Sequence, residues 1–207
     1  MAEIVFPPGA FRRIDEEDDR LFYASPRRTV HLDDAALAAL TRLYAMVVPP
    51  TGCVLDLMAS WRSHLPPWFR GTLIGLGLNR TEMRDNPQLG QALVHDLNQE
   101  PALPVNDAAF DAALCAVSVQ YMTQPLEVFR EVHRALKPGA PFVVSFSNRC
   151  FPEKAVALWQ AANDAQHAAI VTAYFQGSGG WEGLGEFSHT PADGDPLFAV
   201  WGMKVPS

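Results

Sequence analysis

The chain of 207 residues is long enough for one sizeable hydrophobic core and too short for two ordinary ones. Its formal net charge of −7 and pI near 5.3 argue against a general nucleic-acid or anionic-membrane surface, because both need an excess of Lys and Arg. The three cysteines, at positions 53, 115 and 150, lack metal-ligand spacing, and no apolar run reaches about 18 residues. We therefore expect structural thiols in a reducing compartment and a cytoplasmic protein without signal peptide or membrane span.

The first 50 residues predict an irregular segment followed by one helix. Pro7-Pro8-Gly9 and Ser25-Pro26 favour irregular backbone before residue 30. The acidic run at residues 15–19 is most simply a solvated segment. A helix is predicted from Leu32-Asp33 onward, since Asp33 can cap it and apolar residues recur at helical spacing until Pro49-Pro50 ends it.

The middle of the chain predicts strands joined by short connections. Strands are expected at residues 53–57, 72–78 and 92–95, with a short helical stretch after the first strand that runs through Leu65. Apolar runs at 112–119 and 142–146 flank a helix-period segment at 125–136. Lys137-Pro138-Gly139 stops that helix, because proline cannot continue it and glycine can adopt positive φ. This βαβ unit predicts a mostly parallel sheet.

The last part of the chain predicts a helix and a hairpin. Residues 153–175 have helical character, and residues 177–180 break it. Residues 181–188 and 197–204 are expected to be two strands joined by a turn-rich segment. A terminal hairpin fits a purely alternating Rossmann domain poorly.

The chain resembles class I S-adenosylmethionine-dependent methyltransferases at two sequence motifs. These are FDAALC at residues 110–115 and EVFREVHRALKPGA at residues 127–140, and a hydrophobic strand follows the second motif. The resemblance covers roughly residues 50–205. It implies an α/β fold with a doubly wound, mostly parallel seven-stranded sheet and an antiparallel C-terminal hairpin. It also divides the chain into an N-terminal cap or lid segment with a helix, residues 1–48, and a methyltransferase-like domain, residues 49–207. The implied cofactor is S-adenosyl-L-methionine.

The turn after the first strand departs from the family pattern. Residues 54–57, VLDL, match the first motif at its strand and at the acidic Asp56, but Met58-Ala59-Ser60-Trp61 stands where the family has a glycine-rich turn. Glycine permits positive φ and close ligand approach, whereas these residues carry a Cβ atom. The resemblance implies Asp56, Met58, Ser60 and Trp61 as cofactor contacts, either in a working variant turn or in a degenerate site.

Two further loops resemble the ribose and adenine positions of the family. Asn79, followed by Arg80, stands where an Asp or Glu usually holds both ribose hydroxyls, and an amide makes such contacts without the strength of a charge. A simple turn role for Asn79 is the alternative. Asp96 resembles the residue that accepts from the adenine amino group, with Leu97 packing on the ring, and a helix cap is the alternative for Asp96.

The acceptor side of the site is expected after the fourth and fifth strands. Ser118 and Val119 are expected to face the cofactor. Tyr121 either faces the substrate or is a core aromatic residue. Arg149 either clamps an anionic substrate group or forms a surface salt bridge.

The N-terminal cap combines aromatic and cationic residues that are expected to close over the substrate, among them Tyr23, Arg27 and His31. His31 and His64 are candidate general bases, although a lone histidine is more often structural. The six histidines show no short ligand spacing, so no metal is expected.

These patterns predict an S-adenosylmethionine-dependent methyltransferase that acts on a small-molecule acceptor by in-line methyl transfer. The alternative is a non-catalytic methyltransferase-like binding or scaffold protein with a degenerate cofactor site, which the altered turn and the neutral Asn79 motivate. A nicotinamide-dependent oxidoreductase has little support, because Arg80 stands where the dinucleotide fingerprint requires glycine.

Overall fold

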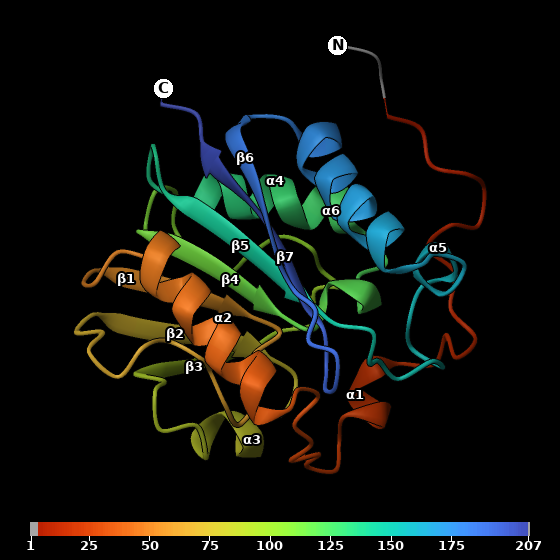
Figure 1. Ribbon diagram of the computed structural model, residues 1–207, viewed down its shortest axis with the longest axis horizontal. Helices are drawn as coiled ribbons and strands as arrows, with labels where there is room; N and C mark the ends of the chain where they lie inside the picture. The colour runs from red at the N-terminus through yellow and green to blue at the C-terminus, as the bar shows by residue number, and fades with distance from the viewer. Residues whose placement is uncertain (1–3, 207) are drawn as a thin grey trace.

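The computed structural model describes residues 4–206, whose strands form one seven-stranded sheet (Figure 1). The strands are β1 (Cys53–Leu57), β2 (Thr72–Gly77), β3 (Gln91–Val94), β4 (Ala112–Ala116), β5 (Pro141–Phe146), β6 (Trp181–His189) and β7 (Leu197–Lys204). Their order is β3-β2-β1-β4-β5-β7-β6, with β1 to β5 parallel and β7 antiparallel to both of its neighbours. The predicted doubly wound sheet with an antiparallel C-terminal hairpin is confirmed.

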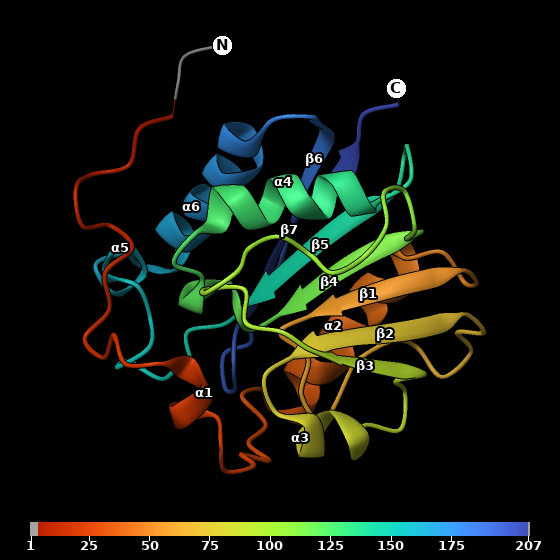
Figure 2. The ribbon, with the colours of Figure 1, turned by 180° about the vertical axis from the view of Figure 1, so that it is seen from behind.

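Helices cover both faces of this sheet. They are α1 (Asp19–Phe22), α2 (Asp34–Val47), α3 (Arg80–Arg84), the 3-10 turn η1 (Val119–Tyr121), α4 (Pro125–Ala135), α5 (Ala157–Gln160) and α6 (Asp164–Ser178). The apolar side of α2 packs on one face, and α4 and α6 pack on the other, where α4 crosses the sheet in Figure 2. Within residues 4–206, no helix combines the length and the apolar character needed to cross a bilayer.

The β4-α4-β5 unit follows directly from its sequence. Pro125 is the first residue of α4, where its missing N–H has no partner to lose. Val128, Phe129 and Val132 recur at helical spacing and are fully buried on the sheet. Gly139 has a φ of 75° and turns the chain back into β5, which is buried along its whole length.

Two predicted helical stretches differ from the structure. The segment from β1 to Leu65 is an irregular loop, because Met58 adopts positive φ and the Ser63 hydroxyl donates to Asp56 across the loop. Residues 153–175 contain two helices instead of one. Asn163 forms a capping box with Gln166, which starts α6 independently of α5.

The acidic run at residues 15–19 is only partly solvated, which corrects the prediction of a solvated segment. Lys154 is fully buried and its Nζ lies 2.9 Å from Asp15 and 3.1 Å from Asp19. Arg13 donates to both carboxylate oxygens of Asp19, at 2.8 and 2.9 Å. A buried ammonium group is tolerated when such partners compensate its charge. The network therefore fixes the start of α1 against the loop that follows β5.

Candidate active site

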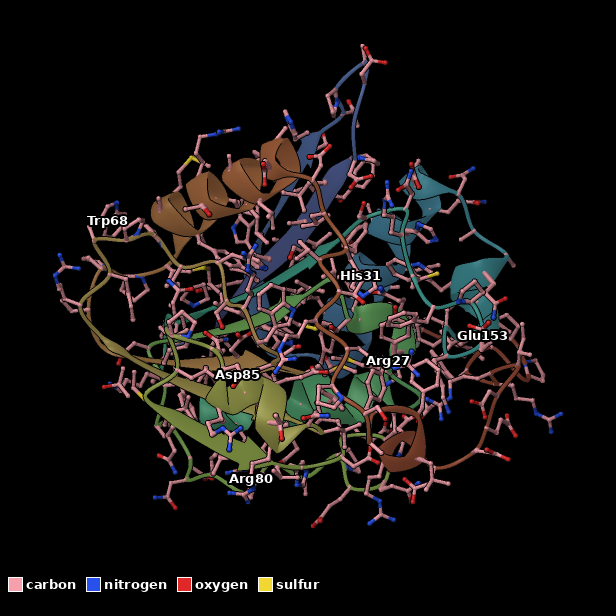
Figure 3. The ribbon with its side chains drawn as sticks, turned by 90° about the horizontal axis from the view of Figure 1, so that it is seen from below. Arg27, His31, Trp68, Arg80, Asp85 and Glu153 are labelled. Carbon is pink, nitrogen blue, oxygen red and sulfur yellow. The ribbon has the colours of Figure 1, made fainter. Side chains whose placement is uncertain are left out.

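A cavity of about 150 Å³ lies at the carboxyl ends of β1, β2, β3 and β4. In a doubly wound sheet this is the edge where ligands bind, because loops diverge there at the switch point of the strand order. The N-terminal segment supplies the rest of the wall with residues from Asp19 to Leu32. Figure 3 shows this segment from below, with Arg27 and His31 labelled.

The turn after β1 brings one strained residue and a close backbone contact to the cavity. Met58 has a φ of 55°, a conformation that glycine adopts without cost. Ala59 donates its N–H to the Leu76 carbonyl at 2.9 Å, which holds the turn against β2. A Cβ atom on Gly77 would lie 2.2 Å from the Ala59 carbonyl oxygen. The glycine that this close approach requires is therefore in β2 and not in the turn.

The carboxylate of Glu82 connects the loop after β1 to the N-terminal segment. Glu82 is buried in the first turn of α3 and accepts hydrogen bonds from the Ser60 hydroxyl and from the backbone N–H of Arg27. Both Glu82 and Ser60 line the cavity. Sequence reasoning selected Ser60 and missed Glu82. Glu82 lies three residues after Asn79, in the first turn of a helix that follows a strand. This position in the sequence is the signal that would have identified Glu82.

Asn79 is the N-cap residue of α3 and uses both ends of its amide. Its Oδ1 accepts from the N–H groups of Thr81 (2.9 Å) and Glu82 (3.0 Å). Its Nδ2 donates to the carbonyl oxygens of Tyr23 (2.8 Å) and Ala24 (3.4 Å). The side chain that resembles the family's ribose contact therefore holds the chain's own backbone in this structure.

Asp96 presents one bonded and one unpartnered oxygen. Its Oδ1 accepts from the N–H groups of Asn98 (3.0 Å) and Gln99 (3.4 Å) in the turn after β3. Its Oδ2 is buried, and no donor among residues 4–206 reaches it. A buried acceptor without a donor is destabilising, so this atom is suited to a ligand. Asp96 and the buried Leu97 beside it both line the cavity.

Asp56 places a carboxyl group with an unusual charge state at the end of β1. Burial raises the pKa of Asp56 to about 7, while the hydrogen bond from the Ser63 hydroxyl opposes this rise. Near neutral pH the group therefore exists in both protonation states. Asp56 lines the cavity, as do Met58 and Trp61.

The segment after β4 contributes Tyr121 to an aromatic pair at the cavity. Val117 turns the chain with a φ of 43°, and Ser118 and Tyr121 then line the cavity, whereas Val119 is fully buried in the core and does not. The Tyr121 hydroxyl accepts the Phe151 N–H at 2.9 Å, and the two rings stack at 6.2 Å. Burial raises the pKa of Tyr121 to about 12, so its hydroxyl stays protonated. Tyr121 is thus both a core residue and a wall residue.

His31 and His64 both line the cavity. Burial lowers the pKa of His31, with a smaller contribution from Arg149. Burial also lowers the pKa of His64, to about 4, with a smaller contribution from Arg62. Both rings are therefore neutral near pH 7 and carry a lone pair. The His31 ring meets the Phe151 ring edge to face at 4.8 Å.

Two arginines that the sequence predicted as site residues, Arg80 and Arg149, lie outside the cavity. Arg80 is the exposed first residue of α3, and Figure 3 shows it toward the rim of the view, away from Arg27 and His31. The Nε of Arg149 donates to Asp195 at 2.6 Å. Arg149 therefore forms a salt bridge, which was the alternative to its binding an anionic substrate group. The loop after β5 contributes Phe151 to the cavity instead.

The described residues show no cluster suited to a metal. Among residues 4–206, no three His, Cys, Asp or Glu side chains are grouped so that they could hold a metal ion. All three cysteines are free thiols, and Cys115 is buried within β4.

Comparison with known sequences identifies a methyltransferase pattern in the middle of the chain. Residues 69–144 match the family model of a methyltransferase domain. A stretch of 69 residues is 33% identical to the biotin biosynthesis bifunctional protein BioHC of Teredinibacter turnerae. This stretch is 33% of the chain and 12% of that relative, so the match spans a small part of its length.

Comparison with solved structures gives the same fold over most of the chain. An S-adenosylmethionine-dependent methyltransferase from Mesorhizobium loti matches with a TM-score of 0.55 and 19% identity, over 83% of this chain and 99% of that chain. A chain from the complex between the Haloferax volcanii Trm112 methyltransferase activator and a putative methyltransferase matches with a TM-score of 0.57 and 17% identity, over 86% and 90%. At these identities the similarity establishes the fold.

Proposed function

We propose that the chain is a class I S-adenosylmethionine-dependent methyltransferase that transfers a methyl group from S-adenosyl-L-methionine to a small-molecule acceptor, which the methyltransferase-domain match at residues 69–144 and the shared fold support. The observation that carries this proposal is the buried, unpartnered Oδ2 of Asp96 in the cavity wall. The adenine amino group is a donor of the kind that this atom lacks. Leu97 beside it offers an apolar surface for a planar ring.

The residues at the end of β1 offer contacts for the remainder of the cofactor. S-adenosyl-L-methionine, when bound, supplies a methyl group activated by its positively charged sulfur. Asp56 offers a carboxyl group that can accept or donate a hydrogen bond near pH 7. The backbone between Met58 and Ser60 lies at the cavity wall, because the turn is held against β2 by Ala59.

The acceptor is proposed to bind on the side of Tyr121, Phe151 and His31. These rings form an apolar wall that would exclude water from the acceptor. An in-line displacement requires the acceptor's nucleophilic atom opposite the carbon–sulfur bond that breaks, and such alignment is worth up to about 7–11 kcal/mol in favourable systems. His31, neutral and in the wall, is placed to take a proton from an acceptor that arrives protonated.

A non-catalytic binding role is the second candidate function. It is favoured by one observation, which is that the amide of Asn79 is occupied by backbone oxygens of the chain itself. A degenerate site would leave S-adenosylmethionine and its product without measurable affinity.

Calorimetric titration with S-adenosylhomocysteine, S-adenosylmethionine and NAD separates these functions. We expect the first two to bind and NAD not to bind. Asp96→Ala should weaken S-adenosylhomocysteine binding about 5- to 150-fold, since a buried polar partner is worth about 1–3 kcal/mol. Asp193→Ala, an exposed carboxylate outside the cavity, is the matched control and should bind like the wild type. No binding of either sulfur compound would favour the non-catalytic role, and unchanged affinity of Asp96→Ala would remove Asp96 from the site.

A further inference from the structure

The segment from the start of α1 to the start of α2 lines the cavity and is anchored at both ends. At its start, Asp19 is held by the buried Lys154 and accepts from the Asn98 amide at 2.8 Å. At its end, Leu32 is buried in the core, and the Asp33 N–H donates to Asp195 at 2.9 Å. Residues 20–31, which we call the lid, lie between these anchors. No strand lies within the lid, so its opening would break no pairing of the sheet.

Two buried side chains hold the backbone of the lid. The Asn79 amide donates to the Tyr23 oxygen at 2.8 Å, and the Glu82 carboxylate accepts from the Arg27 N–H. Asn79 and Glu82 are only 9% and 5% exposed, so these bonds are shielded from water. Together they form what we call the latch.

The remaining polar contacts of the lid are weaker. The Trp61 indole donates to the Thr29 oxygen at a long 3.4 Å. Arg28 pairs with Asp85, but the two side chains are 54% and 33% exposed, and exposed ion pairs add little stability. Among the polar contacts that hold the lid closed, the latch is therefore the main one, and the Phe22 and His31 rings add edge-to-face contacts with Phe151.

The latch explains why residue 79 is an amide. The Tyr23 oxygen is an acceptor, so its partner must donate a proton. A carboxylate, which the family pattern has at this position, carries no proton at neutral pH and would repel the Tyr23 oxygen. The amide can donate to the lid and still cap α3 through Oδ1. The amide at residue 79, which departs from the family pattern, is therefore explained by its hydrogen bond to the lid.

We propose that Asn79 latches the lid over the cavity and that lid closure competes with cofactor binding for its amide. The proposal rests on the proposed function, because the ribose is the group that the family resemblance places at residue 79. A cavity of about 150 Å³ is smaller than the roughly 300–1,000 Å³ typical of ligand sites, so opening of the lid would make room for a cofactor that consists of one nucleoside joined to one amino acid. The closed fraction then lowers the apparent affinity in proportion.

Limited digestion with trypsin tests the latch, because Arg27 and Arg28 are exposed within the lid. The fragments ending at these residues are quantified by mass spectrometry. Asn79→Asp removes the donor and keeps the helix cap, so the unliganded variant should be cut about five- to tenfold faster than the wild type. Asn163→Asp makes the same change at the N-cap of α6, remote from the lid, and should be cut at the wild-type rate.

Two further measurements complete the test. Saturating S-adenosylhomocysteine should speed cleavage of the wild-type lid, and Asn79→Asp should bind this compound more tightly than the wild type. A wild-type cleavage rate for unliganded Asn79→Asp would overturn the latch. Protection of the wild-type lid by the bound compound would overturn the competition. Absence of binding to either protein would instead contradict the proposed function, while the cleavage comparison without ligand would still decide the latch.

Discussion

The β4-α4-β5 unit and the wall formed by the N-terminal segment are stabilised by different kinds of contact. In the first, apolar residues at helical and strand spacing pack against their neighbours along the chain. In the second, single polar contacts join residues far apart in sequence, such as Asn79 with Tyr23 and Lys154 with Glu17. The first kind of structure tolerates change at its surface. The second kind depends on each partner, so loss of a single polar group should cost more there.

The largest effect is expected at the buried charge network. Asp19→Ala removes a carboxylate that pairs with both Arg13 and Lys154, and it leaves two buried cations with fewer partners. We expect the free energy of unfolding to fall by about 3–5 kcal/mol. Glu127→Ala breaks a pair with Arg130 whose side chains are about half exposed, and it should change stability by about 0–1 kcal/mol. Urea denaturation measures both, and equal losses would contradict the distinction between the two regions.

The next effect concerns the contact between the turn after β1 and β2. Gly77→Ala places a Cβ atom 2.2 Å from the Ala59 carbonyl, so backbone must move. We expect a loss of about 1–3 kcal/mol in unfolding free energy, together with weaker binding of S-adenosylhomocysteine. Gly90→Ala meets a Thr72 methyl group at 3.3 Å and the Leu73 carbonyl oxygen at an ordinary 3.6 Å, and it is the matched control. Normal ligand binding by a folded Gly77→Ala protein would show that the turn does not shape the site.

The sequence predicted the regular half of the molecule well, for a physical reason. The helix at residues 125–136 and the strands beside it differ from α4, β4 and β5 by a few residues at most, because local periodicity determines them. The terminal hairpin was also predicted, since its turn-rich link between two strands is local. The helical stretch expected up to Leu65 does not form. Its loop conformation depends on the Ser63 contact with Asp56 and on the strained Met58, and neither has a periodic signature.

The candidate site was predictable where it follows strand ends. Asp56, Ser60, Asp96 and Tyr121 line the cavity, as expected for residues after parallel strands. Glu82 was missed because its importance depends on a backbone N–H 55 residues away. The burial of Asp19 was missed because Lys154, its partner, lies more than 130 residues later in the chain. Contacts of that range leave no pattern in a single sequence.

A third prediction concerns pH and the buried carboxyl group of Asp56. Its pKa in the folded protein, about 7, is above the ordinary value of 3.8, so the folded state binds more protons than the unfolded state between these values. The free energy of unfolding should therefore fall as pH rises from about 4 to about 7, by up to about 1.4 kcal/mol per pH unit.

His64 contributes with the opposite sign, because its pKa is lowered to about 4 and its stabilisation is lost as pH falls. The difference between wild type and Asp56→Asn isolates the carboxyl group. Asn keeps an acceptor for Ser63 and does not titrate. Parallel stability curves for the two proteins across this range would show that Asp56 is charged in the folded state throughout.

The smallest expected effect concerns backbone strain at Met58. The test is whether the glycine or the alanine variant at this position is the more stable. At a φ of 55°, a residue with a Cβ atom is less favourable than glycine by about 1–2 kcal/mol, of which the greater freedom of glycine in the unfolded chain cancels about 0.4–1 kcal/mol. Met58→Gly should therefore be more stable than Met58→Ala by up to about 1.6 kcal/mol, although both lose the methionine side chain. The same two substitutions at the exposed Met46 in α2 should give the reverse order, with Ala more stable by about 1 kcal/mol, because that backbone is helical. Thermal and urea unfolding of the four variants measure the two differences. The same order at both positions would mean that the turn relaxes to ordinary φ when its side chain is shortened, and that strain at Met58 is not what shapes the variant turn.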